Sequence, residues 1–317
     1  MPPEEMMAQT QMKNCTITII VCSYNRAEIL QECLQSLAKQ TAPPSRYEVL
    51  IVDNNSSDTT PLLCRTFTQP YAHFRYITEP RQGLSHARNR GWREAETEWV
   101  AYIDDDARAS GNYVERILHV IEQHEFDCFG GIYTPWYRYA KPRWFRDEYA
   151  SNMNVQDHTG PLASGYVSGG NLIIRRTLLE EFKGFNPNLG MRPGKIAYGE
   201  ETLLQMQLRV AGYTIGFDPQ LTIEHLVGRE KLSPWWFVKS SYARNRDHTR
   251  CMSASSSRTL VQTIKSVIHD LLFYTGRATP QMFSNRYYWQ NWIIEVFSPT
   301  ASHIGSFIGT LQYRIKE

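Results

Sequence analysis

The chain has 317 residues, of which 42% are hydrophobic and 21% are charged, and its formal net charge is +2. A chain of this length can bury a complete α/β core and still carry an additional segment. The near-neutral charge gives no reason to expect nucleic-acid binding, and the absence of an apolar run of about 18 residues argues against a membrane-spanning helix.

The N-terminal residues 1–13 are polar, and we expect them to be disordered and not a secretory signal. Residues 16–21 are β-branched and predict a central strand, while 29–38 carry apolar residues at helical spacing. The same alternation of strand, loop and helix continues and predicts a parallel, doubly wound sheet. The next strands are expected at 47–52, 74–78 and 99–103.

Polar loops follow these strands, and the sheet topology brings them to one edge. They span residues 23–26, 53–58, 81–88 and 104–106. The last loop holds three consecutive carboxylates, which repel one another unless a cation or donor groups neutralise them. Such an edge suits a nucleotide with a metal-bound diphosphate, although an acidic turn that caps the next helix is the alternative. No GxGxxG or Walker sequence is present, which disfavours a dinucleotide or P-loop enzyme.

The second half carries weaker signals, each with a structural alternative. The aromatic and basic run that contains Trp136 could stack on sugar rings or lie at a membrane surface, or it could simply pack. Gly169 and Gly170 precede a strand at 172–174 and allow close approach by a ligand, or form a bulge. Glu200 and Glu201 open a helix that ends before residue 212, and acids are favoured there by the helix dipole alone.

Short strands are expected at 213–217 and 221–225, the second of which ends in His225, a residue type that is usually structural when alone. From residue 228 onward the composition changes and predicts a helical appendage. A serine-rich break is expected at 251–258, and amphipathic helices at 260–274 and 289–297. The expected organisation is therefore a disordered 1–13, a nucleotide-sugar-binding catalytic domain at 14–227 and a helical segment at 228–317.

The order and spacing of these motifs resemble family 2 glycosyltransferases with the GT-A fold, over about residues 14 to 227. The matching stretches are SYNR at 23–26, VDNNSSD at 52–58, GLSHARNRG at 83–91, DDD at 104–106, GGN at 169–171 and GEE at 199–201. Two departures are visible: Cys22 replaces a frequent proline, and Glu201 stands where the family's base motif usually has aspartate. The resemblance implies an α/β fold of the GT-A type with a mostly parallel sheet.

The resemblance also implies an activity. It is that of a metal-dependent, inverting hexosyltransferase that moves a sugar from a nucleotide diphosphate, UDP in the first place, to a hydroxyl of a glycan or glycolipid. Polysaccharide or glycoconjugate biosynthesis is the implied setting. Mn²⁺ or Mg²⁺ would neutralise the leaving diphosphate, and carboxylates are suitable ligands for such hard cations.

The resemblance assigns roles to individual residues. The donor would contact Ser23, Tyr24, Asn25, Arg26, Asp53, Arg88, Asp104 and Asp105, with Asp53 reading the uracil edge. The metal would be held by Asp106, Asp104 and His225. The acceptor would contact Gly170 and Asn171, to which we add Trp136 for its aromatic ring. The general base would be Glu201, with Glu200 as the second candidate.

Two other functions fit the sequence less well. A sugar-nucleotide pyrophosphorylase would need a glycine-rich phosphate loop after the first strand, and residues 22–26 contain no glycine. A non-catalytic binding relic of the same fold would have no need for the complete set of carboxylates. The six cysteines contain no CxxC pair, so zinc is disfavoured and reduced thiols in the cytoplasm are expected.

The segment 229–250 mixes six basic residues with three large aromatic side chains, Trp235, Trp236 and Phe237. One hypothesis is peripheral contact with the inner face of the plasma membrane, which would bring the enzyme to a lipid-linked acceptor. The alternative is that these rings pack the helical tail.

Overall fold

The computed structural model describes residues 15–153, 155–252 and 259–314, so the expected disordered N-terminus and most of the serine-rich break lie outside the described residues. The chain divides into two compact units. The first holds the chain up to Trp136, with Ala150–Pro187 and Leu204–Leu226. The second holds Tyr137–Tyr149, Asn188–Leu203 and the chain from Val227 onward. The second unit therefore includes two segments from within the predicted catalytic region.

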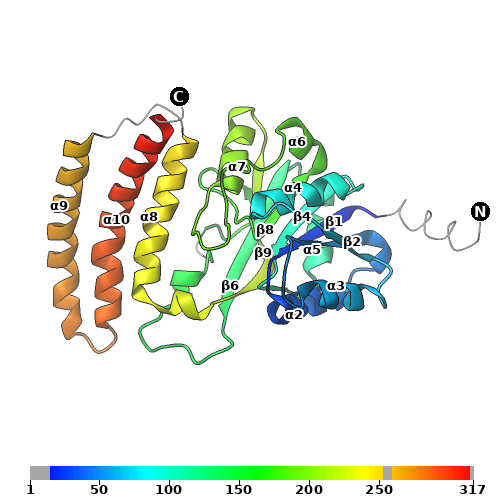
Figure 1. The fold of residues 1–317 in the computed structure, drawn as a ribbon, viewed down its shortest axis with the longest axis horizontal. Coiled ribbons are helices and arrows are strands. Elements are labelled where there is room, and N and C mark those ends of the chain that lie inside the picture. The colour runs from blue at the N-terminus through cyan, green and yellow to red at the C-terminus, as the bar shows by residue number, and fades with distance from the viewer. Residues whose placement is uncertain (1–14, 154, 253–258, 315–317) are drawn as a thin grey trace, which may run out of the picture. The chain divides into compact units, whose positions relative to one another are not determined.

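A curled sheet forms the centre of the first unit (Figure 1). Its strands are β1 (Ile17–Ser23), β2 (Tyr47–Asp53), β3 (Phe74–Thr78), β4 (Trp99–Asp104), β5 (Ala107–Ala109), β6 (Cys128–Trp136), β7 (Gly160–Pro161), β8 (Asn171–Arg175) and β9 (Ile215–Leu226). Their order in space is β3-β2-β1-β4-β8-β6-β9-β5, with β7 beside β9. Six of the nine strands in the described residues, β1 to β4, β6 and β9, run in one direction. The predicted mostly parallel α/β sheet is confirmed.

Each side of the sheet has its own hydrophobic core, because alternate residues of a strand face opposite sides. Ile19 and Val21 of β1 pack with Leu30 of the helix α2 (Ala27–Ala38) on one side, whereas Ile20 packs with Ala87 of the helix α4 (Leu84–Glu94) on the other. The first core is completed by α2 (Ala27–Ala38), α3 (Thr60–Thr68) and α5 (Tyr113–Gln123). The second is completed by α4 (Leu84–Glu94), α6 (Arg176–Glu181) and α7 (Glu200–Val210). The doubly wound arrangement expected from the sequence is therefore present.

One prediction about the strands was wrong. The two short strands expected at 213–217 and 221–225 are a single strand, β9, whose pairing with β6 shifts register between Gly131 and Ile132. A Cβ on Gly131 would lie 2.0 Å from the carbonyl oxygen of Leu221, so only glycine fits at this crossing. The shift in register interrupts the alternation of inward and outward side chains along β9. For this reason the sequence pattern predicted two strands instead of one.

A buried ion pair holds the irregular part of β9. Asp218 is fully buried and accepts hydrogen bonds from Arg116 of α5, from Nε at 2.5 Å and from Nη2 at 3.0 Å. The hydroxyl of Thr159 donates a further bond at 2.8 Å. Burial alone would raise the pKa of Asp218, but the hydrogen bonds from Arg116 and Thr159 hold it below its usual value.

Helices dominate the second unit, as the predicted helical appendage requires. They are α8 (Pro234–Cys251), α9 (Leu260–Ala278) and α10 (Trp289–Arg314). The helix α8 was not predicted as a separate element, and the two helices that were predicted are longer than expected. The unit's short 3₁₀ helices are η3 (Arg229–Leu232) and η4 (Thr279–Phe283), whereas η1 (Pro44–Arg46) belongs to the first unit and η2 (Asp147–Ala150) spans a boundary between the units in the sequence.

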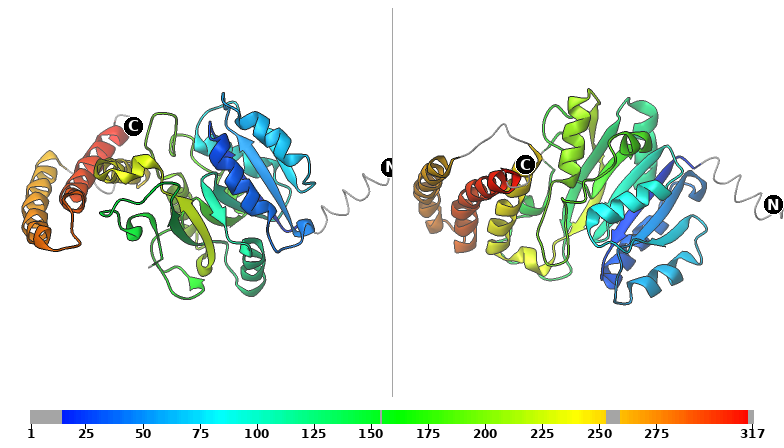
Figure 2. Two further views of the ribbon diagram at one scale, coloured as in Figure 1. Left: turned by 90° about the horizontal axis from the view of Figure 1, so that it is seen from below. Right: turned by 45° about the horizontal axis from the view of Figure 1, so that its top comes forward.

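Close packing joins α10 to α8, and Figures 1 and 2 show α10 between α8 and α9. A Cβ on Gly305 would lie 2.2 Å from the carbonyl oxygen of Tyr242, and one on Gly309 would lie 2.4 Å from that of Arg246. Two glycines four residues apart therefore let the backbones approach. No helix in the described part of the chain is long and apolar enough to cross a membrane.

The basic and aromatic residues of 229–250 are largely engaged within the second unit. Phe237 packs against Phe145 and Tyr149, with ring centroids 6.0 and 5.2 Å apart. The guanidinium of Arg229 lies 3.9 Å from the centre of the Tyr139 ring. These contacts favour the packing alternative over the membrane hypothesis for this segment.

Candidate functional site

The loops at the carboxyl ends of β1, β2 and β4 meet, because the parallel register aligns the ends of these strands. Ser23 pairs with Asp53, and Cys22 pairs with Asp104. The Asn25 side-chain oxygen accepts from the Ser57 amide at 2.7 Å and so joins the first two loops. The expected convergence of polar loops at one edge of the sheet is thus observed.

Asp104, Asp106 and His225 form a cluster with the chemistry of a metal site. One ligand atom from each lies within 4.8 Å of the others. His225 Nε2 is 3.2 Å from Asp106 and 3.5 Å from Asp104, and its Nδ1 lies 3.2 Å from the Leu226 carbonyl oxygen. The antiparallel pairing of β5 with β9 places Ala107 opposite His225 and so carries the histidine to the acidic loop. The structure therefore brings together the three residues expected as metal ligands.

Asp105, in the middle of the acidic run, has different surroundings. Its side chain is buried and accepts hydrogen bonds from Ser23 Oγ at 2.7 Å and from Arg26 Nη1 at 2.9 Å. Burial raises its pKa to about 6, while the charge of Arg26 opposes this shift. Arg26 also reaches Asp106 at 3.1 Å. Asp105 thus fixes the first loop, and Arg26 partly neutralises the acidic run.

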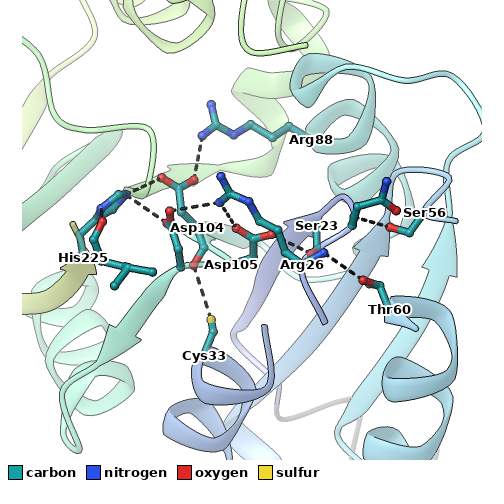
Figure 3. Close-up of polar contacts among 12 residues, drawn as sticks. Ser23, Arg26, Cys33, Ser56, Thr60, Arg88, Asp104, Asp105 and His225 are labelled. Atoms are coloured by element: carbon teal, nitrogen blue, oxygen red, sulfur yellow. Dashed lines mark hydrogen bonds and ion pairs between the residues drawn. The ribbon is translucent and has the colours of Figure 1, made fainter. Parts of the chain in front are cut away.

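Arg88 supports the cluster from α4, and Figure 3 shows Asp104 between Arg88 and His225. Its guanidinium is buried and lies 3.4 Å from Asp104 Oδ1 and 3.1 Å from the Gly169 carbonyl oxygen. The ring of Phe185 lies 5.4 Å away. Arg88 is therefore held in a fixed position at the acids.

Gly170 makes room for Asp104. A Cβ at this position would lie 2.2 Å from Asp104 Oδ2 and 2.7 Å from its Cγ. Gly170→Ala should therefore turn the Asp104 carboxylate away from His225 while leaving the fold intact. A displaced rotamer costs roughly 0.5–1.5 kcal/mol, so we expect Mn²⁺ binding to weaken about 2- to 12-fold in calorimetric titration.

Gly111→Ala is the matched control for this prediction, because a Cβ there would meet no heavy atom within 4 Å. Equal Mn²⁺ affinity in the two variants would show that Asp104 does not need its observed position.

The first two loops carry side chains that differ in exposure. Asp53 is buried and accepts from the Ser56 amide at 3.0 Å and from the Tyr76 hydroxyl at 3.3 Å. Tyr24 is half-buried, whereas Asn25 is exposed, with a φ of 52° that asparagine tolerates better than most residues.

Asn54 was not singled out from the sequence, although it stands in the polar run that was. Its amide group donates to the Glu79 and Arg81 carbonyls at 3.1 and 2.7 Å, and its oxygen accepts from the Gly83 amide at 2.7 Å. Asn54 therefore ties the second loop to the third.

Two expected acceptor contacts have buried side chains. Asn171 accepts from the Tyr113 hydroxyl at 3.0 Å and donates to two carbonyl oxygens at 3.3 Å. The Trp136 ring is covered by Arg108, whose guanidinium lies 3.6 Å from the ring centre, and its Nε1 lies 3.3 Å from the Asp106 carbonyl oxygen. For Trp136 this arrangement favours the packing role that the sequence left open.

Glu200 and Glu201 belong to the second unit, where they begin α7. Glu200 is buried and Glu201 is half-buried. Gly199 before them has a φ of +99°, and a Cβ there would lie 3.1 Å from Cys251 Sγ in α8. The entrance of this helix is therefore packed against α8 within the same unit.

The buried Asp247 of α8 anchors that entrance. Asp247 Oδ2 accepts from the Tyr198 amide at 3.1 Å, and Arg246 and Arg250 bind the same carboxylate at 2.6 and 3.1 Å. Arg246 also donates to the Ile196 carbonyl at 3.1 Å. The sequence showed Asp247 only as one of two acids within a basic stretch, so its role was missed.

The family model described as "Glycosyl transferase family 2" matches residues 18–183, just over half of the chain. The chain belongs to this family. This glycosyltransferase is 28% identical over 202 residues to the glycosyltransferase AglE of Haloferax volcanii, covering 63% of this chain and 64% of AglE. It is also 28% identical over 242 residues to the succinoglycan biosynthesis protein ExoM of Rhizobium meliloti, covering 75% of each chain.

Solved structures agree on the fold. The glycosyltransferase matches the mannosyltransferase PcManGT of Pyrobaculum calidifontis, solved with GDP-Man and Mn²⁺, with a TM-score of 0.64 and 16% identity. The match covers 95% of this chain and 93% of PcManGT. The predicted family, its transferase class and the GT-A fold are confirmed.

Proposed function

We propose that the protein is a metal-dependent, inverting glycosyltransferase that moves a sugar from a nucleotide-diphosphate sugar to a hydroxyl of a glycan or lipid-linked acceptor. The observation that carries this proposal is the cluster of Asp104, Asp106 and His225 at the end of β4, beside loops that suit a nucleotide. Such a reaction leaves negative charge on the departing diphosphate, and a divalent cation at the cluster would neutralise it.

The ligand set favours Mn²⁺ over Mg²⁺. Two carboxylates suit both ions, but Mg²⁺ prefers oxygen ligands, whereas an imidazole nitrogen is better tolerated by a transition metal. Among the fold relatives, PcManGT was solved with Mn²⁺. Arg26 and Arg88 would add fixed positive charge beside the diphosphate, where charge-assisted hydrogen bonds are stronger than neutral ones.

The remaining donor contacts would come from the first two loops. Tyr24 and Asn25 would face the nucleotide, and Asp53 would hold the shape of its loop and accept a hydrogen bond from the base. UDP is our first choice of nucleotide, from the resemblance in the second loop. GDP is the competitor to test, because PcManGT was solved with GDP-Man.

The acceptor hydroxyl must lose a proton as it attacks the anomeric carbon, and a single displacement requires one general base. We assign this role to Glu201, with Glu200 as second candidate. Glu201 is half-buried at the start of α7, and Asp247 fixes the preceding backbone through Tyr198. Direct displacement by a single base-activated hydroxyl inverts the anomeric centre, so we propose an inverting transfer.

Titration calorimetry with UDP and GDP tests the proposal. We expect one of these nucleotides to bind more tightly with Mn²⁺ than with a chelator, because Asp104, Asp106 and His225 would hold a cation that neutralises the diphosphate. Asp106→Ala should abolish this difference and leave the fold unchanged by circular dichroism. Asp157→Ala is the matched control, because the Asp157 side chain is fully exposed.

Equal affinity with Mn²⁺ and with the chelator for both nucleotides would contradict the metal-dependent donor site. Slow hydrolysis of a nucleotide-sugar with Mn²⁺ separates an enzyme from a binding relic of the same fold, because a relic would bind but not hydrolyse. Release of pyrophosphate from a sugar phosphate and nucleoside triphosphate would instead identify a pyrophosphorylase.

The cellular setting that we propose is polysaccharide or glycoconjugate assembly in the cytoplasm. The relative ExoM is by name a succinoglycan biosynthesis protein, which supports a glycan product. The structure holds all six cysteines as free residues, and a compartment that keeps thiols reduced would preserve them.

A further inference from the structure

The helix α9 exposes an apolar stripe. Leu260, Ile264, Ile268 and Leu272 recur every four residues and are 56%, 48%, 52% and 72% exposed. Val261, at 62% exposed, broadens the stripe. Residues four apart lie on one face of a helix, so these five side chains form a continuous surface, named the α9 stripe below.

The face of α9 beside the stripe already packs against α10 and its preceding turn. Leu271 and Tyr274 contact a cluster formed by Ala278, Tyr287 and Val296. Figures 1 and 2 show α9 flanked by α10 on one side, with the outer side of α9 facing away from the helices. The α9 stripe is therefore not needed to attach the helix to its unit.

The segment that carries the stripe has more basic than acidic residues. Lys265, Arg277 and Arg286 are exposed within and after α9. Asp270 is the one acid between residues 259 and 288, and it is engaged by His303 Nε2 at 2.9 Å. A surface with apolar side chains and basic neighbours is complementary to an anionic lipid surface, where the side chains enter the acyl boundary and the cations meet headgroups.

We propose that the α9 stripe lies on an anionic lipid surface, with α9 parallel to the membrane plane. Large apolar side chains near the end of α9 extend the contact, since Phe283 is 90% exposed and Trp289 is 56% exposed. The five side chains of the stripe offer a few hundred Å², whereas a stable dimer interface needs roughly 800 Å² from each partner. A second copy on the same face would also bring two sets of basic residues together.

Co-sedimentation of the full chain with vesicles tests this contact. We expect binding to vesicles of phosphatidylcholine with phosphatidylglycerol, weaker binding at high salt, and little binding to phosphatidylcholine alone. The triple variant Ile264→Gln, Ile268→Gln and Leu272→Gln should lower the partition coefficient about tenfold or more, because burial of these side chains is lost. Lys265→Gln should weaken binding only at low salt.

A matched control replaces exposed apolar residues in the first unit. Leu62→Gln with Val210→Gln, at 66% and 91% exposed in the parent chain, should leave vesicle binding unchanged. Circular dichroism confirms that all variants fold. Absent binding to anionic vesicles, or binding that the triple variant retains, would overturn the proposal. Analytical ultracentrifugation tests the alternative of a second copy. If the wild type is a dimer and the triple variant is a monomer that still binds vesicles, the stripe is a dimer interface and the membrane proposal is wrong.

Discussion

Glu201→Gln is expected to slow sugar transfer by about 10² to 10⁴-fold, the usual contribution of a general base. Glutamine keeps the shape of the side chain but cannot accept the proton of the acceptor hydroxyl. Donor binding should be unchanged, because Glu201 is not among the residues that we assign to the nucleotide or to the metal. The measurement is kcat with donor and acceptor at saturation, together with calorimetric donor affinity.

Glu200→Gln is the matched control for this experiment, because it makes the same change at the neighbouring position. We expect Glu200→Gln to retain most of its rate. A loss at Glu200 and not at Glu201 would transfer the role of base to Glu200. Wild-type rates in both variants would show that neither glutamate removes the proton.

Asp218→Ala is expected to lower the free energy of unfolding by about 3–5 kcal/mol, the cost of leaving one partner of a buried ion pair alone. The change leaves the charge of Arg116 without its carboxylate partner, although the Arg116 side chain is only 15% exposed. It also removes the hydrogen bonds that hold the irregular part of β9. Urea unfolding followed by fluorescence measures the loss. Asp157→Ala, which removes a fully exposed carboxylate, should change the midpoint little.

The pH dependence gives an independent check on this ion pair. The folded-state pKa of Asp218 lies below its usual value of 3.8. The stability that its ionised form contributes is therefore complete well above pH 3.8 and is lost as the pH falls through the lower folded-state pKa. The difference in the free energy of unfolding between wild type and Asp218→Ala should therefore become smaller below about pH 4. A difference that is the same at pH 7 and pH 3 would indicate that Asp218 acts by packing alone.

The sequence predicted the first half of the fold well because local and global signals agree there. Residues 17–23 and 47–53 are short, mostly apolar runs rich in β-branched residues and followed by polar turns, a pattern that favours buried parallel strands. The second half was harder to predict. Register at β9 depends on Gly131 meeting Leu221, a contact between segments about ninety residues apart that no local pattern reveals.

The candidate site shows the same division. The acids at 104–106 indicated a site from the sequence alone, because three adjacent carboxylates repel one another unless a cation or hydrogen-bond donors neutralise them. His225 needed the resemblance, since a single histidine at a strand end has no distinctive spacing. Asn54 and Asp247 could not be assigned from the sequence, because each acts by hydrogen bonds to backbone groups that are distant along the chain.

The anchoring of Tyr198 by Asp247 determines which parts of this enzyme can be exchanged independently. The family match ends at residue 183, before Glu200 and Glu201, and the backbone that presents these glutamates is bonded to α8. Grafting residues 14–227 onto a different C-terminal segment would move the donor loops and the glutamates but leave Asp247, Arg246 and Cys251 behind. The position of the two glutamates should therefore depend on α8. Natural or engineered recombinants that take residues 199–201 and α8 from the same parent should be the active ones.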